Sequence, residues 1–376
     1  MRWRIISFTA RGIRLSEKTA ELLGDRETLL YTKYAGTHES KPESEPGRQP
    51  DAVSYVRESI GDWAEAQLRE RNVLLFIGAC QIAVRAVAPY LTDKLQDPPV
   101  LVMDERGSYV IPILSGHIGG ANELAVLLAG KLGAEPVITT ATDINRKFAV
   151  DLFAKRNGLA IARADKAGIA KISSMVLDGK EIIVSVEPGH ISGTDGEWEK
   201  DKEAKLPTGI RLTGYPPGGT VNVVITSEEK VFPADLLLRP KEYAIGIGCR
   251  KGKEADQIRS FIQKGLTRLG ISSAQVFALA SVSRKSGEPG LLAWSQEEGI
   301  PFLTYPPEEL ELVEGTFRES EFVKQTVGVA NVCERAALKA CGSGGTLALE
   351  KYAENGMTMA VAKREWSVVF DENGEG

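Results

Sequence analysis

The sequence predicts an α/β protein with two α/β domains and a smaller middle region between them. Apolar runs of strand length alternate with helix-length periodic segments over residues 1–143, and again over 241–376. Residues 144–240 follow a different pattern, in which a long polar stretch separates two short strands. With 376 residues, 43% of them hydrophobic, the chain is long enough for roughly two or three separate cores.

The first section alternates strands and helices from its start. The elements expected in order are strands at 4–8, 29–34, 72–79, 100–103, 109–114 and 136–141, and helices ending at 23, spanning 53–68 and 81–91, and ending at 132. Residues 72–79 are almost wholly apolar, which is typical of a central parallel strand covered on both faces. Residues 35–50 are polar and rich in Glu, Pro, Ser and Gly, so we expect a surface loop or a lid there.

A glycine turn connects the strand at 109–114 to the helix that follows it. Its side chains are small at Ser115, Gly116, Gly119, Gly120 and Ala121. A ligand or another backbone segment can therefore approach the main chain closely. The helix start behind the turn is expected to offer unpaired N–H groups to an anion, and ligands of α/β sheets usually bind in loops at the carboxyl ends of strands.

His117 lies in the middle of this turn and is the residue there that can exchange a proton near neutral pH. One interpretation is a turn histidine that bonds its own backbone. The other is a general base for water, oriented by Asn122 or Glu123, with the nearby amides binding an oxyanion. Ser115 is a weaker candidate for a nucleophile, because its surroundings do not form a nucleophile elbow.

The middle region reads as two helical segments followed by two strands. The strands are expected at 181–186 and 220–226, on either side of the polar stretch 189–209. Residues 236–241 are expected to form a connector, because Pro240 interrupts regular structure before the third section begins.

The third section begins with a strand that ends in a second glycine turn, Gly246-x-Gly248-x-x-x-Gly252, and leads into a helix. Further strands are expected at 276–282, 301–305, 346–349 and 358–362, with helices near 291–298, 320–326 and 333–340. Arg250 and Lys251 lie beside the start of the helix that follows this turn, where two cations could bind a carboxylate or phosphate. The sequence is equally compatible with a solvated surface pair.

Four polar residues of the third section remain ambiguous from spacing alone. Cys249 fits either an activated thiol or a buried cysteine at a strand end. Lys285, Glu288 and Glu334 lie at loop ends, where capping or surface solvation is the simpler interpretation.

Composition excludes several classes of function. The 46 Lys and Arg against 51 Asp and Glu give a net charge of -5, with both signs interspersed, which offers no attraction to nucleic acid or an anionic membrane. The cysteines have no C-x-x-C spacing and there are only three histidines, so we expect no metal site. Neither turn matches a dinucleotide fingerprint, and the common phosphate-loop, esterase and zinc-protease motifs are absent. The apolar runs are too short or too interrupted by polar residues for a signal peptide or a membrane span. We therefore expect a cytoplasmic protein.

Several segments taken together resemble one known family. They are residues 85–89, 97–100, 104–107, 114–124 and 139–143 in the first section, and residues 246–252, 285–291 and 332–338 in the third. The Ser-Gly-His-x-Gly-Gly-Ala-Asn block that begins at Ser115 is the most specific of them. On these motifs the chain resembles the cobalt-precorrin-5A hydrolases of anaerobic cobalamin biosynthesis.

The resemblance implies a hydrolase acting on carbon–carbon bonds. Its substrate is a cobalt-bearing tetrapyrrole with a δ-lactone between a ring acetate and the meso carbon that is lost. Water opens the lactone, the two-carbon fragment leaves as acetaldehyde, and cobalt-precorrin-5B results. No cofactor is expected, because the substrate carries the cobalt. The implied partner is thus this small molecule, without nucleic acid or membrane, and a homodimer is compatible with the sequence.

Residue by residue, the motifs place two groups of candidates in this chain. The expected catalytic residues are His117, Glu123 and Glu334. The expected substrate-binding residues are Arg85, Ser115, Gly116, Gly119, Gly120, Asn122, Gly248, Arg250, Lys251, Lys285 and Glu288. Two other classes remain open: a protein that shelters a corrinoid intermediate without chemistry, and an α/β nucleotide-binding enzyme.

Overall fold

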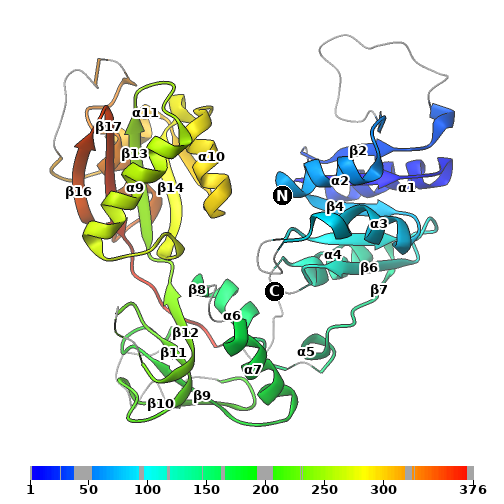
Figure 1. Ribbon diagram of the computed structural model, residues 1–376, viewed down its shortest axis with the longest axis horizontal. Coiled ribbons are helices and arrows are strands. Elements are labelled where there is room, and N and C mark those ends of the chain that lie inside the picture. Colours follow the sequence, from blue (N-terminus) through cyan, green and yellow to red (C-terminus); the bar gives the residue numbers. More distant parts are fainter. Residues whose placement is uncertain are drawn as a thin grey trace. The chain divides into compact units, whose positions relative to one another are not determined.

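The structure is a computed structural model. It describes residues 2–25, 27–37, 53–92, 97–116, 119–145, 147–161, 166–192, 206–228, 230, 232–317, 324–325 and 327–370. The chain divides into two compact units, Met1–Arg146 and Lys147–Gly376. The first unit contains one sheet and the second contains two (Figure 1). The predicted α/β class is confirmed, whereas the domain boundaries at 143/144 and 240/241 stay a prediction.

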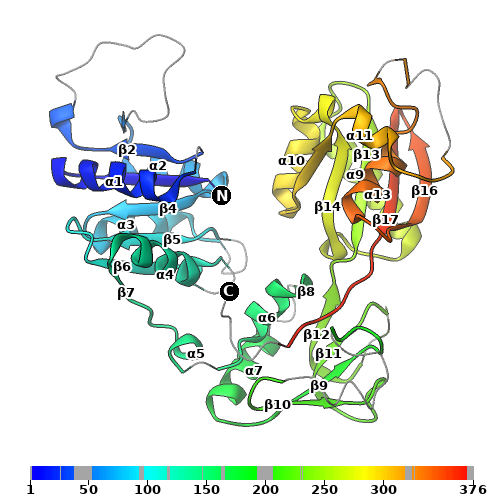
Figure 2. The same ribbon diagram turned by 180° about the vertical axis from the view of Figure 1, so that it is seen from behind.

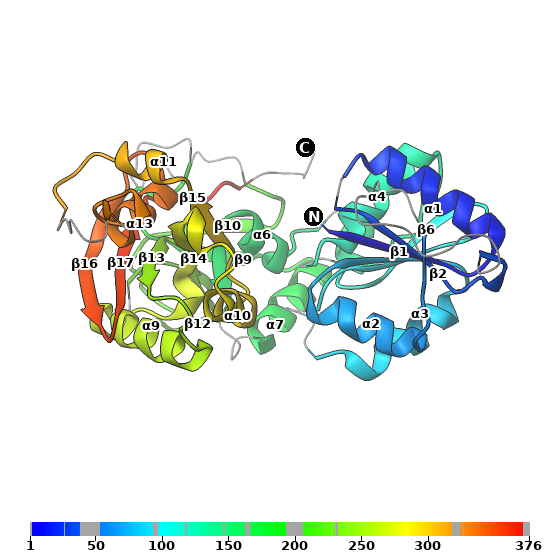
Figure 3. The same cartoon turned by 90° about the horizontal axis from the view of Figure 1, so that it is seen from above.

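The first unit is a seven-stranded sheet with helices on both faces. In spatial order its strands are β3 (Ser54–Tyr55), β2 (Leu29–Thr32), β1 (Trp3–Ser7), β4 (Val73–Ile77), β5 (Val100–Met103), β6 (Tyr109–Leu114) and β7 (Glu135–Pro136). Neighbouring strands pair in parallel except β5 and β6, which are antiparallel. The helices α1 (Ala10–Leu23) and α4 (Ala121–Leu132) cover one face, and α2 (Ile60–Arg69) and α3 (Cys80–Val87) cover the other (Figure 3).

The central strand β4 shows why this sheet has a continuous apolar sequence at its centre. All five of its residues are buried, with Leu75 packed into the core beneath α1 and α4, and Leu74 and Phe76 packed into the core beneath α2 and α3. Because successive side chains of a strand point to opposite faces, a strand covered on both faces needs apolar residues at every position.

Two elements of the first unit differ from the sequence prediction. The helix expected over 53–68 begins only at Ile60, because Ser59 caps it by accepting a hydrogen bond from the Asp62 amide at 3.1 Å. Residues 54–55 before it form the edge strand β3. The strand expected over 136–141 ends at Pro136, and Ala141–Ile144 form a short helix, α5, instead. Short 3-10 helices, η1 (Ala35–Thr37) and η2 (Ala88–Tyr90), complete the regular elements described there.

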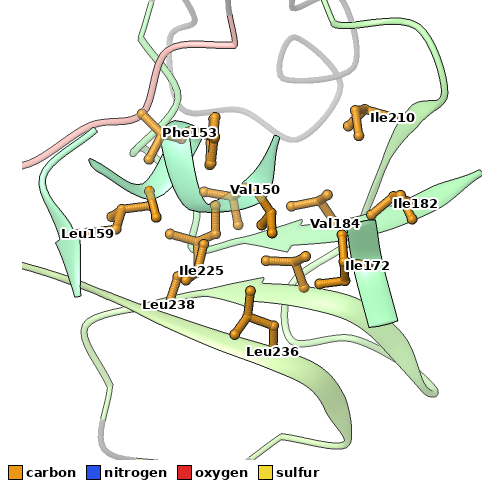
Figure 4. Close-up of a cluster of buried hydrophobic side chains, with 14 of the residues drawn as sticks. Val150, Phe153, Leu159, Ile172, Ile182, Val184, Ile210, Ile225, Leu236 and Leu238 are labelled. Atoms are coloured by element: carbon orange, nitrogen blue, oxygen red, sulfur yellow. The ribbon is translucent and has the colours of Figure 1, made fainter. Parts of the chain in front are cut away.

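The second unit begins with a five-stranded sheet whose core is shown in Figure 4. Its strands are β10 (Ile210–Thr213), β9 (Ile182–Val186), β11 (Val221–Ile225), β12 (Ala234–Pro240) and β8 (Leu159–Ile161), with only the β12–β8 pair antiparallel. The helices α6 (Val150–Arg156) and α7 (Lys166–Leu177) contribute to that core. The connector expected over 236–241 is wrong, because Leu236 and Leu238 alternate into the core and Pro240 is only the last residue of β12.

Residues 366–370 return to this middle sheet after the last strand of the third section (Figure 2). Val368 and Phe370 are buried in the core that the middle strands form, and the Phe370 ring stacks on Phe153 at 4.9 Å between centroids. Trp366 stacks on His190 at 3.8 Å, and the His190 Nδ1 lies 2.8 Å from the Trp366 carbonyl oxygen. Residues 366–370 were expected to belong with the third section, yet they complete the core of the middle one.

The remaining sheet has the strand order β15 (Phe302–Tyr305), β14 (Val276–Val282), β13 (Tyr243–Cys249), β17 (Met357–Lys363) and β16 (Thr346–Glu354). The first three are parallel, and β17 runs antiparallel to both of its neighbours. α9 (Ala255–Leu269) and α10 (Pro289–Glu298) pack on one face, while α11 (Pro307–Glu311) and α13 (Cys333–Cys341) pack on the other. Two 3-10 helices, η4 (Ser273–Gln275) and η5 (Ser283–Lys285), flank β14.

Helix α13 lies very close to β13. A Cβ atom added to Gly246 would lie 1.8 Å from the Cys333 carbonyl oxygen and 2.7 Å from the Ala337 amide nitrogen. Glycine at this position therefore permits the helix and the strand to pack backbone to backbone. Within the described residues, no helix is long and apolar enough to cross a membrane.

Candidate functional site

The glycine turn lies at the end of the first sheet where the parallel strands begin. It was expected at the other end, where they finish. β6 runs against β5 and pairs Leu114 with Val100, so the carboxyl end of β6 meets the amino end of β5. The turn therefore follows the carboxyl end of its own strand, but it faces away from the loops that follow β1, β4 and β5. The turn was expected to lie beside the loops that follow the parallel strands, where ligands usually bind. It does not, because β6 runs antiparallel to β5 and therefore ends at the opposite end of the sheet.

The small residues of this turn accommodate the turn's own chain. Ser115 has a left-handed φ of 56°, and its Oγ donates a hydrogen bond to the Asp97 carbonyl oxygen at 2.6 Å. A Cβ added to Gly119 would lie 2.3 Å from the Ser115 Cβ. From the sequence, either a ligand or another backbone segment could approach the turn closely. At Gly119 the neighbour is a backbone segment, namely Ser115 of the same turn. The Ser115 hydroxyl is held as a donor, which gives no support to a nucleophile.

The first amides of α4 are already engaged. The Ala121 amide donates to the Ser115 carbonyl at 3.1 Å, and the Asn122 amide donates to the Gly116 carbonyl at 3.0 Å. The expectation of unpaired N–H groups at this helix start is therefore wrong for these two positions. The turn folds back and satisfies the donors that the helix cannot.

Three other candidates of the first unit are placed as follows. Asn122 is buried, and its Nδ2 donates to Thr140 Oγ1 at 3.0 Å, which links the turn to the chain after β7. Glu123 is exposed in the first turn of α4, and Arg85 is exposed in the last turn of α3. His117 lies outside the described residues, so its role stays a prediction from the sequence.

The second group of candidates lies where β13 ends. Gly248 and Cys249 are the last residues of the strand, and Arg250 and Lys251 are exposed in the loop that follows. The Arg250 amide donates to the Gly356 carbonyl at 3.1 Å, which fixes the start of the loop to the turn between β16 and β17. The candidate cations Arg250 and Lys251 thus lie at the carboxyl ends of the parallel strands, where ligands of α/β sheets usually bind.

Lys285 and Glu288 meet at the same edge, after β14. The Lys285 Nζ lies 2.8 Å from Glu288 Oε2, and Glu288 Oε1 accepts a hydrogen bond from the Gly252 amide at 2.6 Å. Burial by itself raises the pKa of the Glu288 carboxyl, but the hydrogen bonds from Lys285 and Gly252 outweigh it and hold the pKa below its ordinary value. The Glu288 carboxyl is thus ionised at neutral pH, and its negative charge faces the Lys285 ammonium group.

Cys249 lies close to this pair, yet its surroundings do not activate it. Burial raises the pKa of its thiol above the ordinary value, and the neighbouring Lys285 charge only partly opposes that rise. A thiol with a raised pKa is mostly protonated and weakly nucleophilic at neutral pH. The structure therefore favours an inert, half-buried cysteine at the strand end over the activated one.

Glu334 is buried in the first turn of α13. Its Oε1 accepts a hydrogen bond from the Lys351 amide of β16 at 2.8 Å, and its Oε2 accepts one from the Asn331 side chain. The Asn331 Oδ1 in turn accepts the Glu334 amide at 3.0 Å. Asn331 was not singled out from the sequence, although an asparagine three residues before a helical glutamate is a common pattern at helix starts.

The structure thus brings the candidates together in two groups. The first gathers around the Ser115 turn of the first unit, and the second around the carboxyl edge of β13 and β14 in the second unit. Among the described residues, no three His, Cys, Asp or Glu side chains are grouped so that they could hold a metal ion.

Comparison with known proteins matches both groups. Residues 62–143 match the family model described as Cobalamin synthesis G N-terminal, and residues 243–362 match the one described as Cobalamin synthesis G C-terminus. The first match contains the Ser115 turn. The second contains the loop after β13, the Lys285–Glu288 pair and Glu334.

Two curated relatives extend the similarity over most of the chain. The cobalt-precorrin-5A hydrolase of Priestia megaterium is 32% identical over 366 residues, which cover 96% of this chain and 94% of that protein. The cobalt-precorrin-5A hydrolase of Salmonella typhimurium is 33% identical over 301 residues, 77% of this chain and 81% of that protein. The similarity to the Priestia megaterium protein spans both units of this chain. The chain therefore belongs to the cobalt-precorrin-5A hydrolase family.

Proposed function

We propose that this chain hydrolyses the δ-lactone of cobalt-precorrin-5A and releases the two-carbon fragment as acetaldehyde, giving cobalt-precorrin-5B. The observation that carries the proposal is the 32% identity to a cobalt-precorrin-5A hydrolase over 96% of the chain, because a match of this length spans both units. The substrate is a small tetrapyrrole that brings its own cobalt, so the proposal requires no resident cofactor.

The charges of the second group fit a substrate of this kind. A tetrapyrrole precursor carries several carboxylates, whereas the protein has a net charge of -5, so local cations must hold the substrate. Arg250 and Lys251 are exposed at the carboxyl ends of parallel strands, and an arginine can bind a carboxylate through two parallel hydrogen bonds. We assign these two side chains to substrate carboxylates.

In the proposed mechanism, His117 accepts a proton from the water that attacks the lactone carbonyl. The amides of Gly119 and Gly120 stabilise the oxyanion, and collapse of the intermediate releases the acetate carboxyl and a hydroxyl on the meso carbon. Removal of the hydroxyl proton then forms the aldehyde carbonyl as the carbon–carbon bond breaks. The bonding pair stays on the macrocycle, which takes up a proton.

Glu123 and Glu334 are the two carboxylates proposed to assist this later proton transfer. Glu123 is exposed beside the glycine turn, whereas Glu334 is 2% exposed and accepts hydrogen bonds at both oxygens. These environments favour Glu123 for direct transfer, and they favour Glu334 for holding α13 against β16. Separate alanine variants distinguish them, since only the direct participant lowers the rate of acetaldehyde release when folding is intact.

The deciding experiment is incubation of the protein with the lactone substrate under anaerobic conditions. We expect acetaldehyde to appear in step with a macrocycle that has lost the two-carbon fragment, both detected by mass spectrometry. Stoichiometric binding without acetaldehyde would contradict the proposal and would favour a protein that only shelters the intermediate.

The His117→Ala variant is expected to lower kcat by about 100-fold, because general-base catalysis contributes roughly that factor or more. The measurement is acetaldehyde release at saturating substrate, with circular dichroism to verify folding. Arg106→Ala, an exposed substitution in the turn between β5 and β6, is the matched control and should retain the wild-type rate. A folded His117→Ala protein with the wild-type rate would remove His117 from the mechanism.

The Arg250→Ala variant is expected to raise KM by about tenfold with a smaller change in kcat, because the guanidinium is proposed to bind the substrate before and during the reaction alike. Steady-state kinetics check this. Arg259→Ala, which removes a half-exposed arginine of α9 that pairs with Asp256 and Glu297, should leave KM unchanged. An unchanged KM in Arg250→Ala would reject the assignment of that cation.

Cytoplasmic location and a homodimer are the parts of the proposal that rest on the sequence alone. Fractionation of cells that express the full chain tests the location. Light scattering of the purified protein tests the dimer, for which we expect a mass near twice that of one chain.

A further inference from the structure

Glu288 occupies a position where three segments of the second unit meet. It directly precedes α10, it follows η5, and it contacts the loop after β13 through the Gly252 amide. Only 5% of its side chain is exposed, and 15% of the Lys285 side chain. A buried carboxylate at such a junction requires internal partners, because burying an unpaired charge is costly.

Both carboxylate oxygens have such partners. Oε1 accepts the Gly252 amide at 2.6 Å, and Oε2 accepts Lys285 Nζ at 2.8 Å. Hydrogen bonds to an ionised acceptor are among the stronger ones in proteins. The carboxylate therefore ties the loop to η5 and cancels the charge of Lys285.

The loop that Glu288 holds is also fixed at its other end. The Arg250 amide donates to the Gly356 carbonyl at 3.1 Å, and a Cβ on Gly356 would lie 3.0 Å from the Arg250 Cδ, so the arginine stem lies over the β16–β17 turn. Beyond Glu288, a Cβ on Gly290 would lie 2.3 Å from the Lys253 carbonyl oxygen, so α10 begins directly against the loop. Arg250 therefore lies at the first of these anchors, and Lys251 lies between it and the anchors at Gly252 and Lys253.

We propose that Glu288 is a positioning residue that holds the loop of residues 250–253 in the conformation that presents Arg250 and Lys251 to the substrate. This inference rests on the proposed function and deepens it. A carboxylate that contacted the substrate directly would repel its carboxylates, whereas one neutralised by Lys285 and turned into the protein does not. Lys285 is then the counter-ion of Glu288, and Arg250 and Lys251 bind the carboxylates.

The test compares Glu288→Ala, Glu288→Gln and, as a matched control, Glu297→Ala, which removes an exposed carboxylate from the same helix. Hydrogen–deuterium exchange of the full-length protein is measured by mass spectrometry for peptides that contain Gly252, without substrate. Glu288→Ala should speed exchange of the Gly252 amide by about tenfold, because its acceptor is lost. Glu288→Gln retains an oxygen acceptor and should stay closer to wild type, and Glu297→Ala should not change.

Kinetics with the lactone substrate form the second arm. We expect Glu288→Ala to raise KM by about tenfold with kcat within about threefold, and the Arg250→Ala/Glu288→Ala double variant to raise KM by less than the product of the single effects. Glu288→Gln keeps one oxygen acceptor for the Gly252 amide but leaves Lys285 without its counter-ion, so it should raise KM less than Glu288→Ala does.

The outcomes separate this inference from the proposed function. Unchanged exchange in Glu288→Ala overturns the positioning role, whatever the reaction is. A fall in kcat in both Glu288 variants, with KM unchanged, also overturns it and assigns the carboxylate to the chemistry. If the wild-type protein released no acetaldehyde, the proposed function would fail while the exchange result still decided whether Glu288 holds the loop.

Discussion

Replacing Gly246 by alanine is expected to destabilise the second unit by about 3 kcal/mol or more, at the upper end of what overpacking a core costs. The added methyl group would lie 1.8 Å from the Cys333 carbonyl oxygen and 2.7 Å from the Ala337 amide. Both are backbone atoms of α13, so no side chain can rotate away and the whole helix must move. Urea denaturation followed by circular dichroism measures the change.

Gly287→Ala is the matched control, because a Cβ at this exposed glycine of the same unit meets no atom within 4 Å. Its free energy of unfolding should stay within about 0.5 kcal/mol of wild type. A Gly246→Ala protein as stable as Gly287→Ala would show that α13 does not lie against β13 as described. Because α13 carries Glu334, the destabilised variant should also lose activity.

The strands at the centres of the sheets were predictable because their sequences are constrained on both faces. β4 is apolar at every position, and β13 carries Gly246 where the backbone of α13 leaves no room for a side chain. Each of these local patterns has one dominant physical cause. The alternation of such strands with amphipathic helices was therefore enough to predict the α/β class.

Other features depend on contacts between distant residues and could not be predicted from local pattern. Pro240 suggested a connector, yet it closes β12, where a proline at the last position costs the ladder little. The reversed direction of β6 places the Ser115 turn at the opposite sheet edge, and only strand pairing reveals this.

Within the candidate sites, residue types were predictable but their partners were not. Lys285 and Glu288 were both predicted as substrate-binding residues, which stays a prediction, and the structure adds that Lys285 pairs with Glu288 and that Glu288 also accepts the Gly252 amide. Their separation of three residues is compatible with such a pair, although the same spacing allows both side chains to point outward. The contact of Glu334 with the Lys351 amide required the fold to be known, whereas its contact with Asn331 follows a spacing that is common at helix starts.

The Phe370→Ala variant is expected to destabilise the second unit by about 3 kcal/mol, the cost of truncating a buried phenylalanine. Phe370 is 6% exposed and stacks on Phe153 of α6, although it follows the third sheet in the sequence. The lost stability should therefore appear in the middle sheet, where hydrogen exchange in β9 and β11 should accelerate, and not in β13 or β14.

Val369→Ala isolates the effect of the buried face of this terminal segment. Val369 is 43% exposed, and the bonds that it makes to Asn157 use only its backbone, at 2.7 Å from its amide and 3.2 Å to its carbonyl oxygen. The control should change the free energy of unfolding by no more than about 0.5 kcal/mol. If Phe370→Ala lowered the free energy of unfolding as little as Val369→Ala does, burial of the Phe370 ring would contribute nothing. The segment would then be held by its backbone alone. A large effect of Phe370→Ala alone would establish that residues from the end of the chain form part of the middle core.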